Sequence, residues 1–277
     1  MQIKLSLLSL ALFVSSALSK PVHTICGNDA AVDASVEKAV AARVSANRSA
    51  GRLANATERA AVSVPVYWHV ITDGSTGRLS STAIQNSISV LNNEYAEAGY
   101  TFRLAGSETT VNSNWFNNVN QGTSAEASMK NSLRKGGPEA LNVYTVQFSG
   151  GLLGYATFPW SYSSAPKNDG IVLQWSTYPN GPLTSYNTGK VLVHEAGHWF
   201  GLYHVFQGGC SGTGDGVADT PPQSKVTSGC PASQDSCAGG GVDSIHNHLD
   251  YSVDSCRTEF TPGQVTRMND ISDTYRF

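Results

Sequence analysis

The sequence is short of charge, and the charge it carries is not clustered. Only 14% of its 277 residues are charged, the formal net charge is −3, and no run of Lys and Arg stands out. Binding to nucleic acid or to an anionic membrane surface needs a basic patch, so we expect neither partner. The content of 40% hydrophobic residues is typical of a globular protein, and the length is sufficient for one substantial domain.

Long hydrophobic runs are also missing, apart from a short one at the start of the chain. The segment MQIKLSLLSLALFVSSALSK has a Lys before an apolar run, followed by small residues at Ala17-Leu18-Ser19. This pattern predicts a secretory signal peptide over residues 1–19. A membrane anchor is the alternative, but serines interrupt the run and it is shorter than the roughly 20 residues that span a bilayer. We therefore expect a secreted, extracellular protein without a membrane segment.

No cysteine lies between Cys26, near the start of the chain, and a group close to its end. That group has four members: Cys210, Cys230, Cys237 and Cys256. An even number of cysteines in an exported chain indicates two disulfides, although spacing alone leaves all three pairings open. Cys26 is left over and needs a separate explanation.

Aromatic residues are scarce in residues 20–63, which are rich in Ala, Val, Ser and Arg and look weakly helical. This segment carries two predicted N-glycosylation sites, Asn47 and Asn55. The composition changes at VPVYWHVI, where β-branched and aromatic residues predict a strand. We expect a prosegment over residues 20–63 and the main folded unit over residues 64–277.

The folded unit begins with alternating helix and strand patterns, which predict a mixed α/β sheet. The first helix is expected in STAIQNSISVLNNEYAEAG, with a capping box from Thr82 to Gln85 and a stop at Gly99. Strands are expected in YTFRLAG, ALNVYTVQF, GYATFP and GIVLQW, and a short helix in SAEASMKNSLRKG. A Gly-, Ser- and Asp-rich region follows, and a final helix is capped by Thr261 and Gln264.

The stretch HEAGHWFGLYH places three histidines and a glutamate in an apolar setting. His194 and His198 are four residues apart, so both imidazoles lie on one face of a helix and can bind one metal ion. Glu195 is rotated by about 100° from His194, where it can reach a metal-bound water as a general base. Two zinc ligands and a base are the arrangement of a hydrolytic zinc site.

His204 can become the third ligand only if the helix ends first. In a continuous helix it would be rotated by about 240° from His198 and point away. Gly201 can adopt the left-handed conformation that ends a helix and lets the chain turn back. Three neutral imidazoles leave the fourth position of one zinc ion open for water, as a catalytic site requires.

HEAGHWFGLYH matches the H-E-x-x-H-x-x-G-x-x-H signature of the metzincin endopeptidases. The downstream segments GVADTPPQ and GGGVDSIHNHLDYSVDSCRTEFTPGQVTRM resemble the pappalysins, especially the extracellular metalloproteases of ascomycete fungi. The resemblance implies an α+β fold with a five-stranded mixed sheet and an active-site helix. An irregular, disulfide-bonded subdomain ending in a C-terminal helix would complete the cleft. The catalytic domain would cover residues 64–277, cleave proteins or peptides, and act as a monomer.

The resemblance also assigns roles in the turn beneath the metal. Leu249 stands where the family has a methionine, an apolar exchange of similar volume that is usually mild. Tyr251 matches a tyrosine that would stabilise the tetrahedral intermediate, with a packed core tyrosine as the alternative. The implied disulfides pair Cys210 with Cys237 and Cys230 with Cys256.

Two further features depend on the resemblance. Substrate would bind antiparallel to an edge strand, whose residues are expected to be Tyr155, Ala156, Thr157 and Phe158. Calcium is a second metal to consider, as in some pappalysins, although solvated loop carboxylates are an equal alternative. The candidate calcium ligands are Asp215, Asp219, Thr220 and Asp243.

The unpaired Cys26 resembles the cysteine switch of related prosegments, because it is followed by Gly27 in HTICGNDA. Its thiolate would occupy the open zinc position and keep a zymogen latent. An intermolecular disulfide or an inert thiol remains the alternative. For the whole protein, the rival functions are a zinc-binding protein without catalysis and metal-dependent hydrolysis of something other than peptides.

Overall fold

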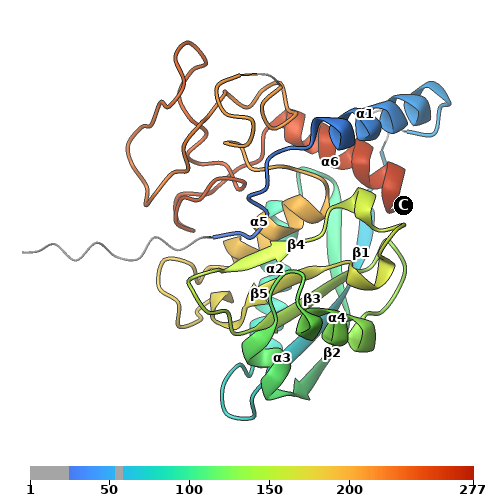
Figure 1. Ribbon diagram of the computed structural model, residues 1–277, viewed down its shortest axis with the longest axis vertical. Coiled ribbons are helices and arrows are strands. Elements are labelled where there is room, and N and C mark those ends of the chain that lie inside the picture. Colours follow the sequence, from blue (N-terminus) through green and yellow to red (C-terminus); the bar gives the residue numbers. More distant parts are fainter. Residues whose placement is uncertain (1–24, 54–58, 212) are drawn as a thin grey trace, which may run out of the picture.

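A five-stranded sheet forms the centre of the computed structural model, which describes residues 25–53, 59–211 and 213–277 (Figure 1). The strand order is β2-β1-β3-β5-β4, which confirms the expected five-stranded mixed sheet. The strands are β1 (Val62–Thr72), β2 (Tyr100–Val111), β3 (Leu141–Val146), β4 (Gly154–Ala156) and β5 (Ile171–Gln174). All neighbouring strands are parallel except β4, which is antiparallel to β5 and forms an edge of the sheet. The expected signal peptide and Asn55 lie outside the described residues.

Two strand boundaries differ from the sequence-based expectation. β1 begins at Val62, two residues before the boundary that we expected at residue 64. The edge strand β4 ends at Ala156, so Thr157 and Phe158 lie beyond it. The strand stops early because the chain enters a 3-10 turn, η1 (Pro159–Ser161), with Pro at its first position.

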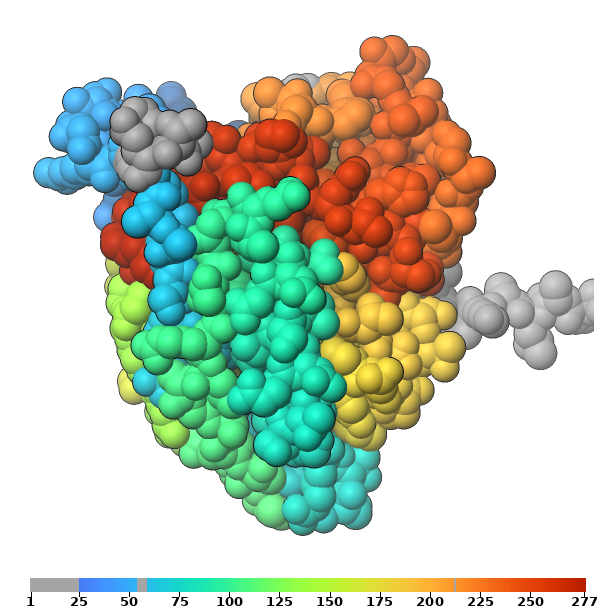
Figure 2. Space-filling model, turned by 180° about the vertical axis from the view of Figure 1, so that it is seen from behind, coloured from blue at the N-terminus to red at the C-terminus, as the bar shows by residue number. Residues whose placement is uncertain are grey.

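Helices cover both faces of the sheet. The helices of the described residues are α1 (Ala34–Ser49), α2 (Ser81–Glu94), α3 (Ser113–Asn118), α4 (Ser124–Leu133), α5 (Lys190–Trp199) and α6 (Pro262–Tyr275). Residues of α2 and α5 pack into one buried cluster with the sheet, and residues of α3 and α4 into a second. Figure 2 shows the molecule from behind, where α2 and β2 form much of the surface next to the irregular region.

The two capping boxes expected from the sequence have different outcomes. The final helix α6 has the expected box, in which Thr261 and Gln264 each bond to the other's backbone. For α2 the prediction was wrong, because Ser80 caps the helix and its hydroxyl accepts from the N–H of Ala83 at 3.1 Å. Ser80 precedes two further residues with cap-forming hydroxyls, so the sequence offered several starts within one turn.

An irregular region follows the histidine-rich stretch at residues 194–204. Within the described part of residues 202–260, the structure contains no helix or strand apart from one β-bridge. Two disulfides close this region, Cys210–Cys237 and Cys230–Cys256, which are the pairs that the resemblance implies. They span 27 and 26 residues, and loops of this length contribute roughly 3–4 kcal/mol each in the chain-entropy model.

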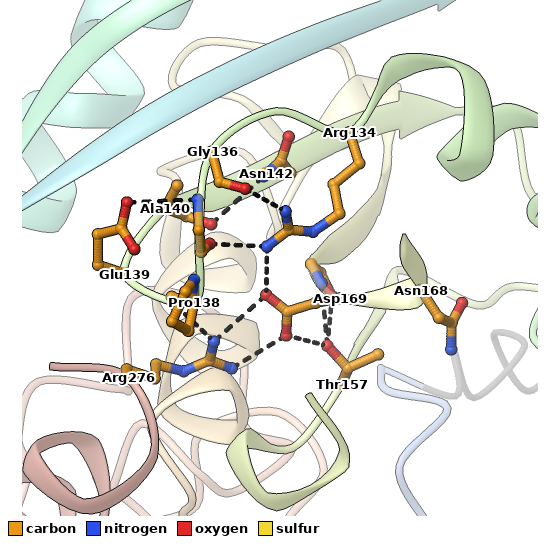
Figure 3. A network of polar contacts seen from close by, with 12 residues as sticks. Arg134, Gly136, Pro138, Glu139, Ala140, Asn142, Thr157, Asn168, Asp169 and Arg276 are labelled. Atoms are coloured by element: carbon orange, nitrogen blue, oxygen red, sulfur yellow. Dashed lines mark hydrogen bonds and ion pairs between the residues drawn. The ribbon is translucent and has the colours of Figure 1, made fainter. Parts of the chain in front are cut away.

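A buried carboxylate joins the C-terminus to the sheet (Figure 3). Asp169 is 1% exposed and accepts two hydrogen bonds from Arg276, at 3.1 and 3.2 Å. Thr157, just after the edge strand, donates to it at 2.9 Å, and the indole of Trp199 at the end of α5 donates at 3.2 Å. Burial alone would raise the pKa of Asp169, but the charge and hydrogen bonds of Arg276 outweigh burial and lower it. The network therefore fixes the C-terminal end of α5.

Replacing this carboxylate should destabilise the fold. We expect Asp169→Asn to lower the free energy of unfolding at pH 7 by about 3–5 kcal/mol, because Arg276 keeps its buried charge without a partner. The pKa of Asp169 in the folded protein is lower than in the unfolded chain. Its contribution to the free energy of unfolding is therefore fully present above about pH 4–5 and is lost as the pH falls through the folded-state pKa. Denaturant unfolding at pH 7 and at about pH 3 should show the difference between the two proteins shrinking in acid. The control is Glu97→Gln, at an exposed position. Equal stability of Asp169→Asn and wild type at pH 7 would contradict the prediction.

Candidate active site

Helix α5 and the turn that follows it bring three imidazoles together. His194 and His198 lie one turn apart on α5, and their Nε2 atoms are 3.3 Å apart. The helix then ends, and the chain reverses at Gly201, which has a φ of +101°. His204 thereby reaches both imidazoles, with its Nε2 atom 3.1 Å from that of each. The left-handed glycine that the spacing demanded is present, and a Cβ there would lie only 2.8 Å from Ile271 on α6.

Backbone carbonyls orient two of the imidazoles. The Nδ1 atom of His194 lies 2.7 Å from the carbonyl oxygen of His248, and that of His198 lies 2.7 Å from the oxygen of Leu202. An N–H donated from Nδ1 leaves the lone pair of Nε2 facing the centre of the group. Burial, above all, lowers the pKa of all three histidines, to about 4 for His198. The neutral form, which binds metal, is therefore favoured.

The spacing of these nitrogens fits a metal ion. Nitrogen ligands of a tetrahedral zinc ion lie about 3.3 Å apart, given zinc–nitrogen distances of about 2.0–2.1 Å. The three Nε2 atoms form a triangle with sides of 3.1, 3.1 and 3.3 Å. The Sγ atom of Cys26 and one nitrogen from each histidine all lie within 4.8 Å of one another. The chain thus offers three imidazoles and one thiol, a set that zinc binds well.

Glu195 lies beside this group and is fully buried. Its Oε2 atom accepts from the thiol of Cys26 at 3.4 Å, while Oε1 has no hydrogen-bond partner among the described residues. Burial raises the pKa of Glu195 well above its usual range. A Cβ at Gly154 on the edge strand would lie 2.7 Å from Oε1, so glycine makes room for the carboxylate. A buried carboxylate with a free oxygen is suited to accept and release a proton.

Tyr251 and Leu249 border the site on the side of the irregular region. The hydroxyl of Tyr251 lies 3.0 Å from the carbonyl oxygen of Cys26 and also contacts the carboxylate of Asp29. Leu249 is buried beneath α5, where a Cβ on Gly197 would lie 2.9 Å from it. Leu249 therefore fills the space under the histidines.

The segment from Ile25 to Ala30 crosses the site. Around Cys26, the N–H of Gly27 donates to the carbonyl of Gly154 at 2.9 Å, and the N–H of Gly154 donates to the carbonyl of Ile25 at 3.1 Å. This bridge is parallel, so the segment runs in the same direction as β4. Sequence reasoning identified Cys26 in this segment but not its polar neighbours.

Three residues of the site were not found from the sequence. The side chain of Asn28 bonds to both the N–H and the carbonyl of Ala156, at 3.0 and 2.9 Å. Asp29 contacts Tyr251, and its carboxylate lies 3.7 Å from Nδ1 of His204. Gln207 bonds to the segment from the opposite side. The only signal in the sequence was the position of these polar residues, just after the Cys26-Gly27 pair and just after the histidine motif at residues 194–204.

The candidate calcium ligands do not form a single cluster in the structure, although Asp215 and Thr220 are in contact. Asp215 accepts from Thr220 at 2.7 Å, Asp219 accepts from the first residues of α6, and Asp243 accepts from Gln234 and Ser236. Two metal-sized groups of His, Cys, Asp or Glu occur among the described residues, and neither includes these aspartates. Calcium binding stays a prediction.

The expected glycosylation site Asn47 lies half-buried on α1, with Nδ2 3.4 Å from the hydroxyl of Thr274.

The chain is similar in sequence to known metalloproteases. Residues 138–273 match the peptidase M43 family model, described as pregnancy-associated plasma protein-A. An extracellular metalloprotease of Sordaria macrospora is 45% identical over 100% of this chain and 98% of its own length. One of Podospora anserina is 50% identical over 78% of this chain and 75% of its own.

Structural similarity extends to a bacterial relative. A promirolysin mutant of Tannerella forsythia superposes with a TM-score of 0.68 and 26% identity, covering 91% of this chain and 94% of the other. No helix in the described part of the chain has the length and apolar character needed to cross a membrane. The chain belongs to the pappalysin family and is a metalloendopeptidase with a metzincin-like fold.

Proposed function

We propose that the chain is a zinc-dependent endopeptidase that is secreted as a latent zymogen. The observation that carries the proposal is the buried triangle of His194, His198 and His204, with Glu195 and Cys26 beside it. Secretion is supported by the signal-peptide pattern in residues 1–19 and by relatives named extracellular metalloproteases. We further infer that the protein acts as a monomer on protein or peptide substrates.

The three histidines would hold one zinc ion, which supplies Lewis-acid polarisation and a lowered pKa for water. Glu195 accepts a proton from the attacking water through its free carboxylate oxygen and then delivers it to the leaving amine. The hydroxyl of Tyr251, released from Cys26 and Asp29, donates a hydrogen bond to the oxygen that gains negative charge. Leu249 supports the floor of the site.

The N-terminal segment accounts for latency. A substrate that adds to the edge strand β4 in an antiparallel sense runs opposite to the segment around Cys26, which is parallel to β4. The peptide bonds of that segment therefore lie beside Glu195 in the direction opposite to those of a substrate, and they are not cleaved. Cys26 would fill the ligand position that water needs.

A second contact holds the proposed prosegment in place. Helix α1 lies beside the C-terminal helix α6 (Figure 1). Arg267 on α6 donates to both carboxylate oxygens of Glu37, at 2.6 and 2.8 Å, and Arg48 forms an ion pair with Asp270. Val40 is the buried residue of α1, so charged groups dominate this contact. Docking of α1 keeps the Cys26 segment close to the active site.

Two alternative functions can be separated from this one. A zinc-binding protein without catalysis has no need for a buried, partly unpaired Glu195, which is costly to retain. Hydrolysis of a substrate other than peptide does not explain why the edge strand has its backbone groups paired with an extended segment. Both observations favour the endopeptidase.

Removal of the metal should stop proteolysis. We expect 1,10-phenanthroline to abolish casein digestion by the matured protein, and added Zn²⁺ to restore it, because Glu195 and Tyr251 cannot activate water alone. The control is 1,7-phenanthroline, which has similar shape but does not chelate. Metal analysis of the treated protein gives the zinc content. Digestion that continues in metal-free protein would refute the proposed function.

A further inference from the structure

Gln207 joins the metal site to the segment that crosses it. Its Oε1 atom accepts from the backbone N–H of His204 at 2.7 Å. Its Nε2 atom donates to the backbone carbonyls of Asn28 and Ala30, at 3.0 and 2.5 Å. The side chain is 6% exposed, so both donors point into a nearly closed space. The amide thus orients itself on a metal ligand and presents its donors to a bound chain.

The structure shows that this space is one peptide chain wide. The side-chain amide of Asn28 exchanges two hydrogen bonds with Ala156 on the edge strand, at 2.9 and 3.0 Å. The carbonyl of the same residue accepts from Gln207 on the other side. Asn28 is therefore held between β4 and Gln207, and those two elements form opposite walls of the cleft.

A substrate strand would meet the same two walls. In an antiparallel pair, one residue exchanges both hydrogen bonds with the residue directly opposite, as the side chain of Asn28 does with Ala156. The residues on either side of it direct their carbonyls away from that partner strand. Those carbonyls would face the wall formed by Gln207.

The position along the substrate follows from the direction of the edge strand. Glu195 lies against Gly154, and Ala156 is two residues further along β4. An antiparallel substrate passes Ala156 before it reaches Gly154. The substrate residues between these walls therefore precede the bond that is cleaved.

We propose that Gln207 is a substrate-binding residue that donates from Nε2 to a backbone carbonyl on the amino-terminal side of the scissile bond. This inference rests on the proposed endopeptidase function. When the N-terminal segment leaves, the amide loses both of its carbonyl acceptors and faces the opened cleft, where a substrate carbonyl can take the place of one of them. Because the acceptor is a backbone atom, Gln207 selects for an extended chain and not for a particular side chain.

The test uses matured wild-type protein and Gln207→Glu, with peptides that have one, two, three or four residues before the scissile bond. Glutamate keeps the acceptor for the N–H of His204 but has no donor. We expect kcat/KM of the wild type to rise as the peptides lengthen, and the variant to lose about tenfold on the long peptides. On the peptide with a single residue before the bond, the loss should be much smaller than on the long peptides.

Two controls make the outcome decisive. Equal zinc content in the two proteins ensures that the metal site is intact. Gln207→Leu, which lacks both donor and acceptor, should show the same dependence on peptide length if donation to substrate is the role. The proposal would be overturned if lengthening the peptide raised kcat/KM equally in wild type and Gln207→Glu. It would also be overturned if the variant lost the same factor in kcat/KM at every peptide length. A wild-type protein that cleaves no peptide would instead refute the endopeptidase function.

Discussion

Glu195→Ala is expected to lower kcat/KM for peptide hydrolysis by about 10²–10⁴-fold, the usual contribution of a general base, while the protein keeps its zinc. The carboxylate lies beside the histidine triangle but is not part of it, and its Oε1 atom is free of hydrogen-bond partners in the described structure. Removing it takes away the group that moves the proton and leaves the three ring nitrogens in place. The measurements are kcat/KM on a peptide and zinc content by elemental analysis.

The matched control is His198→Ala, which removes one of the three converging nitrogens. That variant should lose zinc and activity together, whereas Glu195→Ala should lose activity alone. Glu195→Gln, which keeps the shape but not the charge, should behave as Glu195→Ala does. Loss of zinc from Glu195→Ala would contradict the assignment of Glu195 as a base acting on water. Retained proteolysis in that variant would contradict it equally.

The convergence of the three imidazoles in this site followed from helical periodicity. The spacing of His194 and His198 requires one face of a helix, and the structure puts their Nε2 atoms 3.3 Å apart. His204 could join them only through a helix end at Gly201, which the structure contains at φ +101°. These features are local, within residues 194–204, so the sequence pattern was sufficient.

Features that depend on residues distant in sequence were not predictable from local patterns. The Asp169–Arg276 network joins residues 107 apart, and Gln207 contacts a segment 177–179 positions earlier in the chain. No periodicity links such residues. The end of β4 at Ala156 was also not predicted, because GYATF reads as one strand by propensity alone, although Pro159 marks the turn that follows it. The mixed sheet itself was predicted from alternating strand and helix patterns and is confirmed.

Cys26→Ser in the zymogen should give a protein that is active before prosegment cleavage, or that matures faster than wild type. In the structure Cys26 is unpaired and fully buried, and its Sγ atom lies within 4.8 Å of the converging histidine nitrogens. A hydroxyl is a far weaker zinc ligand than a thiolate, so water and substrate compete more easily for the site. An intermolecular disulfide through Cys26 would require the buried segment to leave the cleft first, which disfavours that alternative.

Alkylation of the thiol supplies an independent measurement. Burial, and then the charge of Glu195, raise the pKa of Cys26. The docked thiol is fully buried, so alkylation requires the segment to leave the cleft, and removal of zinc takes away one of the contacts that hold it there. In the intact wild-type zymogen, iodoacetamide should label Cys26 only after zinc is removed or the prosegment is displaced. Some latency should persist in Cys26→Ser, since Asn28 still pairs with Ala156 and α1 stays docked on α6. A zymogen whose Cys26 is freely alkylated yet remains latent would contradict the switch. Inhibition would then come from the bulk of the prosegment and from its contacts with β4 and Gln207.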